Sequence, residues 1–150
     1  MYFKEEHKDL FTLPKEYYLV QCISADFKMG AGIATQFNQY FNIKNKLINR
    51  YHNLAIQDWD KGNLGFCILE DKVFNLVTKR NYWLKPTYKT LQNSLLSMKN
   101  LIIKNNINKI AMPLIGCGLD RLEWNQVSQI IKDTFNDIDI EILICKKAED

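Results

Sequence analysis

The stretch IAMPLIGCGLDRLEW, from Ile110 to Trp124, decides how the rest of the sequence is interpreted. It begins as an apolar run typical of a buried strand, passes two glycines that flank Cys117, and ends with the pattern of a helix start. Glycines between a strand and a helix let backbone N–H groups approach a ligand closely, and N–H groups at a helix start favour anions. The stretch offers no lysine to a phosphate, so an anionic ligand must be held in another way.

A second glycine-bearing loop, SADFKMGAGIA from Ser24 to Ala34, follows the apolar run at residues 18–24. In an open α/β sheet, ligands bind at the carboxyl ends of strands, where both loops are expected to lie. Two opposed loops whose glycines allow positive φ and expose N–H groups would suit a diphosphate; these glycines are Gly30, Gly32, Gly116 and Gly118. Known phosphate motifs are absent, because there is no GxxxxGK and GAGIAT has threonine where GxGxxG needs its last glycine.

Hydrophobic periodicity alternates between strands and helices along the chain. Strands are expected at residues 2–4, 18–24, 107–112 and 138–145, and two β-rich runs joined by Glu70-Asp71-Lys72 are expected within residues 63–78. Helices are expected at residues 33–41, 43–52, 88–105 and 123–135, the third beginning just after Lys85-Pro86-Thr87. This alternation predicts a single α/β domain over residues 1–150, with a mostly parallel or mixed sheet.

Composition narrows the class of protein. The chain has 150 residues, with 47% apolar and 25% charged residues but only 6 glycines and 3 prolines, which excludes collagen-like and disordered chains. Its formal charge of +3 tolerates an anionic ligand but is no nucleic-acid footprint. Four scattered cysteines and two histidines predict reduced thiols and no metal site. Because neither a signal peptide nor an apolar run near ~18 residues is present, we expect a soluble cytoplasmic protein, nuclear in a eukaryote, without membrane contact.

Six blocks of residues resemble the macrodomain family, in the branch of the terminal ADP-ribose protein glycohydrolases (ALC1-like macrodomains). In chain order they are KDLF at residues 8–11, QCIS at 21–24, KMGAGIA at 28–34, LVTK at 76–79, KPTY at 85–88 and MPLIGCGLDRLEW at 112–124. Their order and spacing are far more specific than any single block. The resemblance implies a three-layer α/β/α sandwich with a mixed, mostly parallel central sheet, an ADP-ribose cleft at the top of that sheet, and no cofactor or metal.

The resemblance also implies the ligand contacts. Asp9 would accept a hydrogen bond from the adenine amino group, although the chain has Lys8 where the family has glycine. Backbone N–H groups of residues 30–34 and 115–119 would hold the diphosphate and distal ribose. The implied ADP-ribose-binding set is Asp9, Leu10, Ile23, Ser24, Gly30, Ala31, Gly32, Ile33, Ala34, Pro113, Leu114, Ile115, Gly116, Cys117, Gly118 and Leu119. Simpler roles stay open for Asp9 and Ser24, which could cap turns, and for Cys117, which could be a small residue or a nucleophile.

Lys79 and Asp120 match the residues that carry catalysis in the glycohydrolase branch. Cleavage at the anomeric carbon of a ribose passes through an oxocarbenium-like state, which a carboxylate stabilises while also moving protons. An opened ribose exposes a carbonyl that a neutral lysine amine can trap as a Schiff base. From the residues alone, Lys79 could instead be a solvated strand-end lysine, and Asp120 could be the N-cap of the following helix.

The resemblance implies an ADP-ribosyl hydrolase that removes terminal ADP-ribose from acidic protein side chains, or from nucleic acid, and that also deacylates O-acyl-ADP-ribose. The implied partners are ADP-ribose and ADP-ribosylated protein, DNA or RNA, and the chain is expected to be a monomer. Two alternatives stay open: a non-catalytic ADP-ribose reader and an ADP-ribose-1″-phosphate phosphatase. We expect residues 81–84 to form a lid beside Lys79, whereas Trp59, Tyr82 and Trp83 are core or rim aromatics.

Overall fold

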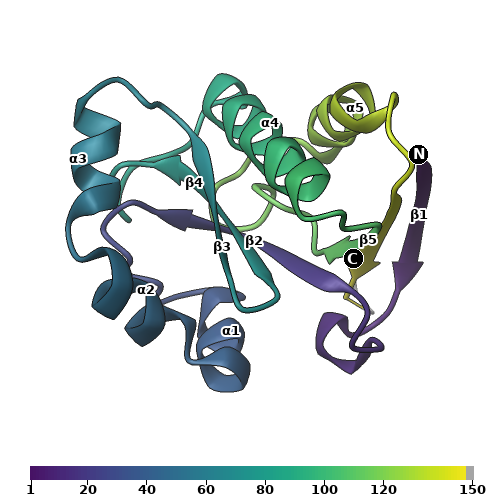
Figure 1. The fold of residues 1–150 in the computed structure, drawn as a ribbon, viewed down its shortest axis with the longest axis horizontal. Coiled ribbons are helices and arrows are strands. Elements are labelled where there is room, and N and C mark those ends of the chain that lie inside the picture. The colour runs from purple at the N-terminus through teal and green to yellow at the C-terminus, as the bar shows by residue number, and fades with distance from the viewer. Residues whose placement is uncertain (148–150) are drawn as a thin grey trace.

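The computed structural model describes residues 1–147 and contains a six-stranded sheet with helices on both faces (Figure 1). The strands are β1 (Tyr2–His7), β2 (Tyr18–Ser24), β3 (Phe66–Glu70), β4 (Val73–Lys79), β5 (Lys109–Met112) and β6 (Glu141–Lys146). Their order is β1-β6-β5-β2-β4-β3, and among these strands only β3 is antiparallel to its neighbour. The expected mixed, mostly parallel sheet is confirmed.

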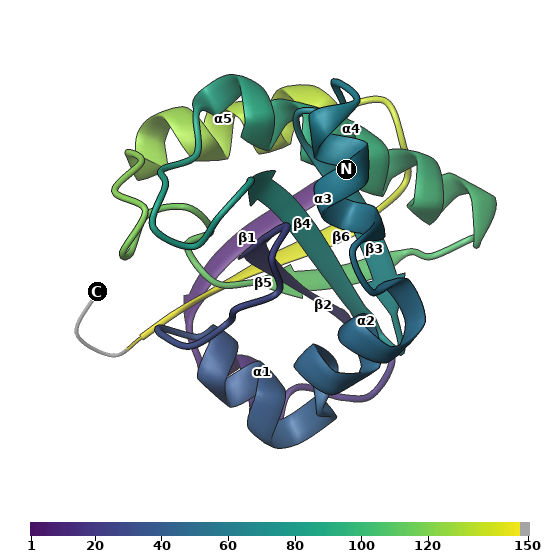
Figure 2. The same ribbon diagram turned by 90° about the vertical axis from the view of Figure 1, so that its left-hand side faces the viewer.

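The helices form the two outer layers. They are α1 (Ala34–Phe41), α2 (Ile43–Tyr51), α3 (Leu54–Asp60), α4 (Tyr88–Lys104) and α5 (Trp124–Phe135), and a short 3-10 helix, η1 (Leu10–Thr12), follows β1. Figure 2 shows α4 and α5 above the sheet and α1 and α2 below it, with α3 near the β3 edge. The three-layer sandwich is therefore confirmed, and none of the helices within residues 1–147 is long and apolar enough to span a membrane.

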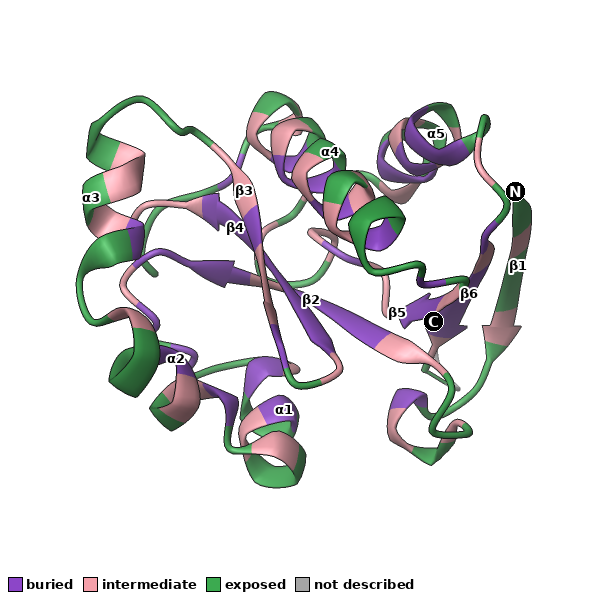
Figure 3. Ribbon diagram, viewed as in Figure 1, coloured by how far each residue is buried: buried purple, intermediate pink, exposed green. Residues whose placement is uncertain are grey.

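Each face of the sheet has its own hydrophobic core. Val73 and Val77 of β4 pack with α1 and α2, whereas Phe74 and Leu76 of the same strand pack under α4 and α5. Both sets are fully buried, so β4 is apolar on both faces, as central strands of parallel sheets are (Figure 3). Such double burial fixes the register of β4 and hence the place where its last residue, Lys79, emerges.

Most predicted elements are confirmed, with shifts at their ends. The first strand runs to His7 rather than stopping at residue 4, because it pairs along its length with β6. The strands predicted at 107–112 and 138–145 begin later, at Lys109 and Glu141, because the residues before them still close the ends of helices. Helix α3 was not predicted, because its 7 residues are too few for a helical repeat of apolar positions to show in the sequence.

Candidate active site

The first glycine loop, which follows β2, is held in place by two buried side chains. Phe27 and Met29 have φ of 55° and 50°, and both side chains are buried. Left-handed conformations are strained for such residues and persist only where the surroundings enforce them, which is a common property of ligand-binding loops. The Phe27 and Met29 side chains hold the loop against the core, while residues 30–32 are exposed beyond the end of β2.

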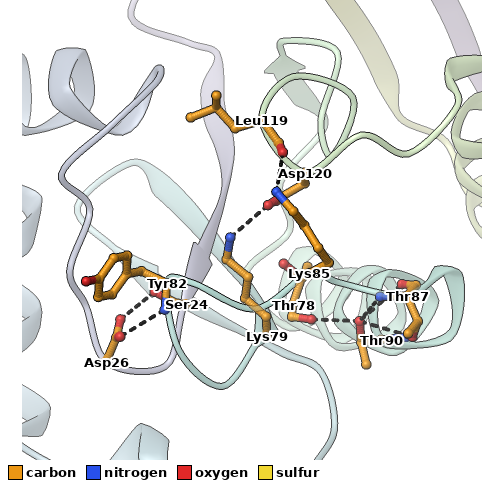
Figure 4. Close-up of polar contacts among 10 residues, drawn as sticks. All are labelled: Ser24, Asp26, Thr78, Lys79, Tyr82, Lys85, Thr87, Thr90, Leu119 and Asp120. Carbon is orange, nitrogen blue, oxygen red and sulfur yellow. Dashed lines mark hydrogen bonds and ion pairs between the residues drawn. The ribbon is translucent and has the colours of Figure 1, made fainter.

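Asp26 joins this loop to the segment that follows β4 (Figure 4). Its Oδ1 accepts hydrogen bonds from the Ser24 hydroxyl at 2.5 Å and from the Lys28 backbone N–H at 3.1 Å, and its Oδ2 accepts one from the Tyr82 N–H at 3.0 Å. Ser24 is buried and donates its hydroxyl to Asp26, so it supports the loop. Sequence reasoning gave Asp26 no role, although an aspartate bonding to an N–H two residues later is a known turn-forming pattern.

The second glycine loop, residues 113–122, turns sharply at Gly116. Gly116 has φ +72°, its carbonyl accepts a hydrogen bond from the Leu122 N–H at 2.7 Å, and a Cβ there would lie 3.0 Å from the Leu122 side chain. Gly32 in the first loop also has a positive φ, of +62°. Of the four glycines that could adopt a positive φ, Gly32 and Gly116 do so and Gly30 and Gly118 do not.

The two loops approach each other at Leu119. The Leu119 side chain reaches within 3.5 Å of the position that a Cβ on Gly32 would take. Leu119 is nevertheless 64% exposed, so it lies across the entrance between the loops. A ligand held by both loops would lie below or displace this side chain.

Lys79 and Asp120 form an ion pair between the two loops (Figure 4). The Lys79 Nζ donates to Asp120 Oδ1 at 2.7 Å, and each side chain is only 14% exposed. Lys79 is therefore no solvated lysine, and Asp120 does not cap α5, whose N-cap residue is Glu123. The two residues meet because β4 and β5 are both parallel to β2, which places their carboxyl ends at one edge of the sheet.

Arg80 points away from this pair, as expected for the next residue along a strand. Its guanidinium binds both carboxylate oxygens of Asp60 in α3, at 2.8 and 3.0 Å, and lowers the pKa of that carboxyl by hydrogen bonding. Arg121, beside Asp120, is exposed and makes no ion pair within residues 1–147. The cation that contacts Asp120 is thus Lys79.

The two thiols near the site are poor nucleophiles. Burial raises the pKa of Cys117 to about 11. Burial also raises the pKa of Cys22, and the negative charge of Asp120 adds to that rise. Both thiols are therefore protonated at neutral pH. The thiolate is the nucleophilic form of cysteine, so neither thiol is in its reactive form. Within residues 1–147, no group of three or more His, Cys, Asp or Glu side chains could hold a metal ion.

Asp9, which was expected to contact adenine, has the capping role left open by the sequence. It is the N-cap of η1, where its Oδ1 accepts from the Phe11 N–H at 2.9 Å, and it is exposed to solvent. Leu10 and Ile23 are buried in the core that also contains side chains of α1 and α2. Lys8 continues the β1–β6 pairing through its N–H and has no positive φ, so no glycine is needed at this position. The capping bond leaves a second carboxylate oxygen for a ligand.

Exposed aromatic residues border the site beside Lys79. Tyr82 and Trp83 are 54% and 65% exposed and pack edge to face, with ring centroids 5.2 Å apart. They are rim residues, whereas Trp59 is half-buried against the α1–α2 core. That residues 81–84 close over a ligand as a lid stays a prediction.

The site thus consists of two glycine loops and a shielded lysine–carboxylate pair at one edge of the sheet of an α/β domain. The Macro domain family model matches residues 65–131. The human and bovine proteins named ADP-ribose glycohydrolase OARD1 are each 40% identical over 137 residues, which cover 91% of this chain and 86% of the relative. The chain therefore belongs to the macrodomain family.

Solved structures agree with this fold. The macrodomain of Thermus aquaticus DarG superimposes with a TM-score of 0.73 at 21% identity, covering 95% of this chain and 97% of that one. Thermosipho africanus DarTG, solved in complex with ADP-ribose, gives a TM-score of 0.64 at 18% identity, covering 91% of this chain and 39% of that one. At these identities the likeness establishes the arrangement of strands and helices.

Proposed function

We propose that this macrodomain is an ADP-ribose glycohydrolase that removes terminal ADP-ribose from modified macromolecules, acidic side chains of proteins above all. The observation that carries the proposal is the Lys79–Asp120 pair, held at 2.7 Å and largely shielded from water between the two glycine loops. A non-catalytic ADP-ribose-binding module would need only the two glycine loops. The relatives that are 40% identical bear the name of this same activity.

Binding depends on the two loops. The backbone of each loop bends at a glycine with positive φ, Gly32 in the first loop and Gly116 in the second, and N–H groups in such bends can donate to diphosphate oxygens. These donors carry partial positive charge without a full ionic group, which explains how an anion is held with no lysine in either glycine turn. Asp9, exposed at the far end of the sheet edge, would accept from the adenine amino group.

Catalysis then follows from the ion pair. Lys79 gives a proton to Asp120, and its neutral amine attacks the anomeric carbon of the distal ribose. The bond from this carbon to the acyl oxygen breaks, and its electron pair leaves with the carboxylate of the acceptor side chain. The nitrogen carries two protons after the attack and gives one of them to solvent. Ring opening then converts the new carbon–nitrogen bond into a protonated Schiff base, with Asp120 supplying the proton to the ring oxygen. Water adds to the same carbon, the amine leaves, and free ADP-ribose and Lys79 are regenerated.

The proposal is tested with a peptide that carries ADP-ribose on glutamate. We expect the purified protein to release free ADP-ribose and unmodified peptide. Mass spectrometry detects both products. Parallel reactions with ADP-ribosylated DNA, O-acyl-ADP-ribose and ADP-ribose-1″-phosphate define the accepted linkages. Binding of ADP-ribose without release from any of these would refute the hydrolase and leave the reader function.

Gly116→Ala is expected to weaken ADP-ribose binding as well as the fold. A positive φ costs an alanine about 1–2 kcal/mol, and the new methyl would press on Leu122 at 3.0 Å. Gly62→Ala is the matched control, because its φ is +104° but a Cβ there would contact nothing within 4 Å. Calorimetry and thermal denaturation should show both variants destabilised and only Gly116→Ala impaired in binding. If the two variants bound ADP-ribose with equal affinity, Gly116 would have no role in ligand binding.

Cys117→Ser is expected to keep turnover within about 2-fold of the wild type, because a buried, protonated thiol contributes little nucleophilicity. Cys117 contacts the Ile115 carbonyl through Sγ at 3.3 Å, and a serine hydroxyl can make the same contact. Steady-state assays with the modified peptide measure this directly. A loss of several hundred-fold would instead assign the chemistry to the thiol.

A further inference from the structure

The KPTY block, Lys85 to Tyr88, has no part in the chemistry above, yet two of its side chains bond to the loop that carries Asp120. The Lys85 Nζ donates to the Leu119 carbonyl at 2.6 Å, directly before Asp120 (Figure 4). The Tyr88 hydroxyl accepts at 3.1 Å from the backbone N–H of Glu123, the N-cap residue of α5, where the loop ends. The start of α4 therefore holds this loop on both sides of the catalytic carboxylate.

Residues 119–121 need such a clamp because packing does little to place them, whereas Leu114, Ile115 and Leu122 of the same loop pack against the core. Leu119 and Arg121, which flank Asp120, are both exposed. Arg121 also has φ 63°, a strained value for a non-glycine residue. The loop's own hydrogen bonds, from Arg121 N–H to Gly118 and from Leu122 N–H to Gly116, define its shape. They do not fix the distance between Asp120 and strand β4, because both partners belong to the loop.

The same turn of α4 also holds the other member of the pair. The Thr90 hydroxyl donates at 2.7 Å to the carbonyl of Thr78, the residue before Lys79. Thr87 and Thr90 form a reciprocal capping box, which makes this first turn rigid. Figure 4 shows these contacts side by side. One rigid turn is thus bonded to the strand end that carries Lys79 and to the loop that carries Asp120.

We propose that Lys85 and Tyr88 are positioning residues that align Asp120 with Lys79, an inference that rests on the hydrolase function proposed above. Neither side chain touches the reacting atoms. Lys85 fixes the peptide that precedes Asp120, and Tyr88 fixes the entry into α5 that follows it. Loss of either contact lets the carboxylate drift from the lysine amine while the diphosphate loops keep their main-chain donors.

The test compares three variants, Lys85→Met, Lys85→Arg and Tyr88→Phe, with the control Lys89→Met. Lys89 is an exposed lysine in the first turn of α4, and its side chain has no partner within residues 1–147. Since a misplacement of about 1 Å can reduce rate by about 100-fold, we expect Lys85→Met to lower kcat by about 10- to 100-fold and Tyr88→Phe by several-fold. KM and the Kd for ADP-ribose should change by less than about 2-fold, because these variants leave the main-chain donors in place. Lys85→Arg, which still donates to the carbonyl, should recover most of kcat.

Wild-type release of ADP-ribose is measured first, and its absence would overturn the hydrolase itself. With an active wild type, an unchanged kcat in both Lys85→Met and Tyr88→Phe overturns the positioning role. A raised Kd with unchanged kcat also overturns it, because Lys85 would then contact the ligand. Melting temperatures identify any variant that fails to fold. If either Lys85→Met or Tyr88→Phe fails to fold, the kcat of the other variant decides whether the positioning role holds. Lys89→Met should match the wild type throughout.

Discussion

Lys79→Arg is expected to be inactive but folded, with kcat reduced by about 10³-fold or more, the scale on which loss of a nucleophile acts. Arginine keeps the positive charge and can still bond to Asp120, so the ion pair between the loops is retained. Its guanidinium stays protonated and cannot attack a carbon. The variant therefore separates the chemistry of Lys79 from its structural contact.

The measurement is release of ADP-ribose from the glutamate-modified peptide, together with the Kd for free ADP-ribose and the melting temperature. Lys79→Ala should be equally inactive but less stable, because it leaves the Asp120 carboxylate, only 14% exposed, without its partner. Lys89→Ala, in the first turn of α4, is the control for loss of a nearby surface lysine. Turnover by Lys79→Arg at the wild-type rate would rule out the amine as nucleophile.

Asp120→Asn is expected to lower kcat by about 10²- to 10⁴-fold, the usual contribution of general acid–base catalysis. Asparagine has the same shape and its oxygen can still accept from Lys79, but it cannot take the ammonium proton or return one to the ribose. ADP-ribose affinity should stay close to that of the wild type, since the diphosphate donors lie on the backbone of both loops.

Combining Asp120→Asn with Lys79→Arg extends the test. Because the two groups act in one proton transfer, the double variant should be no slower than the slower single variant. Asp139→Asn, at an exposed aspartate without a side-chain partner within residues 1–147, controls for loss of a carboxylate. Losses that multiply would show that Lys79 and Asp120 act independently, contrary to the mechanism.

The family and the sheet could be predicted because their signals are local. The apolar run of β4 and the blocks around Gly30 and Gly116 are contiguous in the sequence, and parallel strands bring their carboxyl ends to one edge. That rule was enough to predict two opposed glycine loops. It also brought Lys79 and Asp120, 41 residues apart, to the same place.

The supporting contacts could not be predicted, because they are single bonds between a side chain and a distant backbone group. Asp26 accepts from the Tyr82 N–H, and Lys85 donates to the Leu119 carbonyl. No periodic pattern in the sequence indicates either contact. The conformation of each glycine could not be predicted either. All four glycines permit a positive φ, and which glycine of each pair adopts it depends on the path of the loop: Gly32 and Gly116 do, whereas Gly30 and Gly118 do not.

The covalent step at Lys79 is tested most directly by trapping. Wild type, Lys79→Arg and Asp120→Asn are each mixed with the glutamate-ADP-ribosylated peptide and sodium borohydride, then analysed by intact mass and fragmentation. We predict that wild type alone gains one reduced ADP-ribose efficiently, located on Lys79, and that Lys79→Arg gains none. Release of ADP-ribose by wild type without any trapped adduct, or an adduct on another residue such as Cys117, would contradict the account.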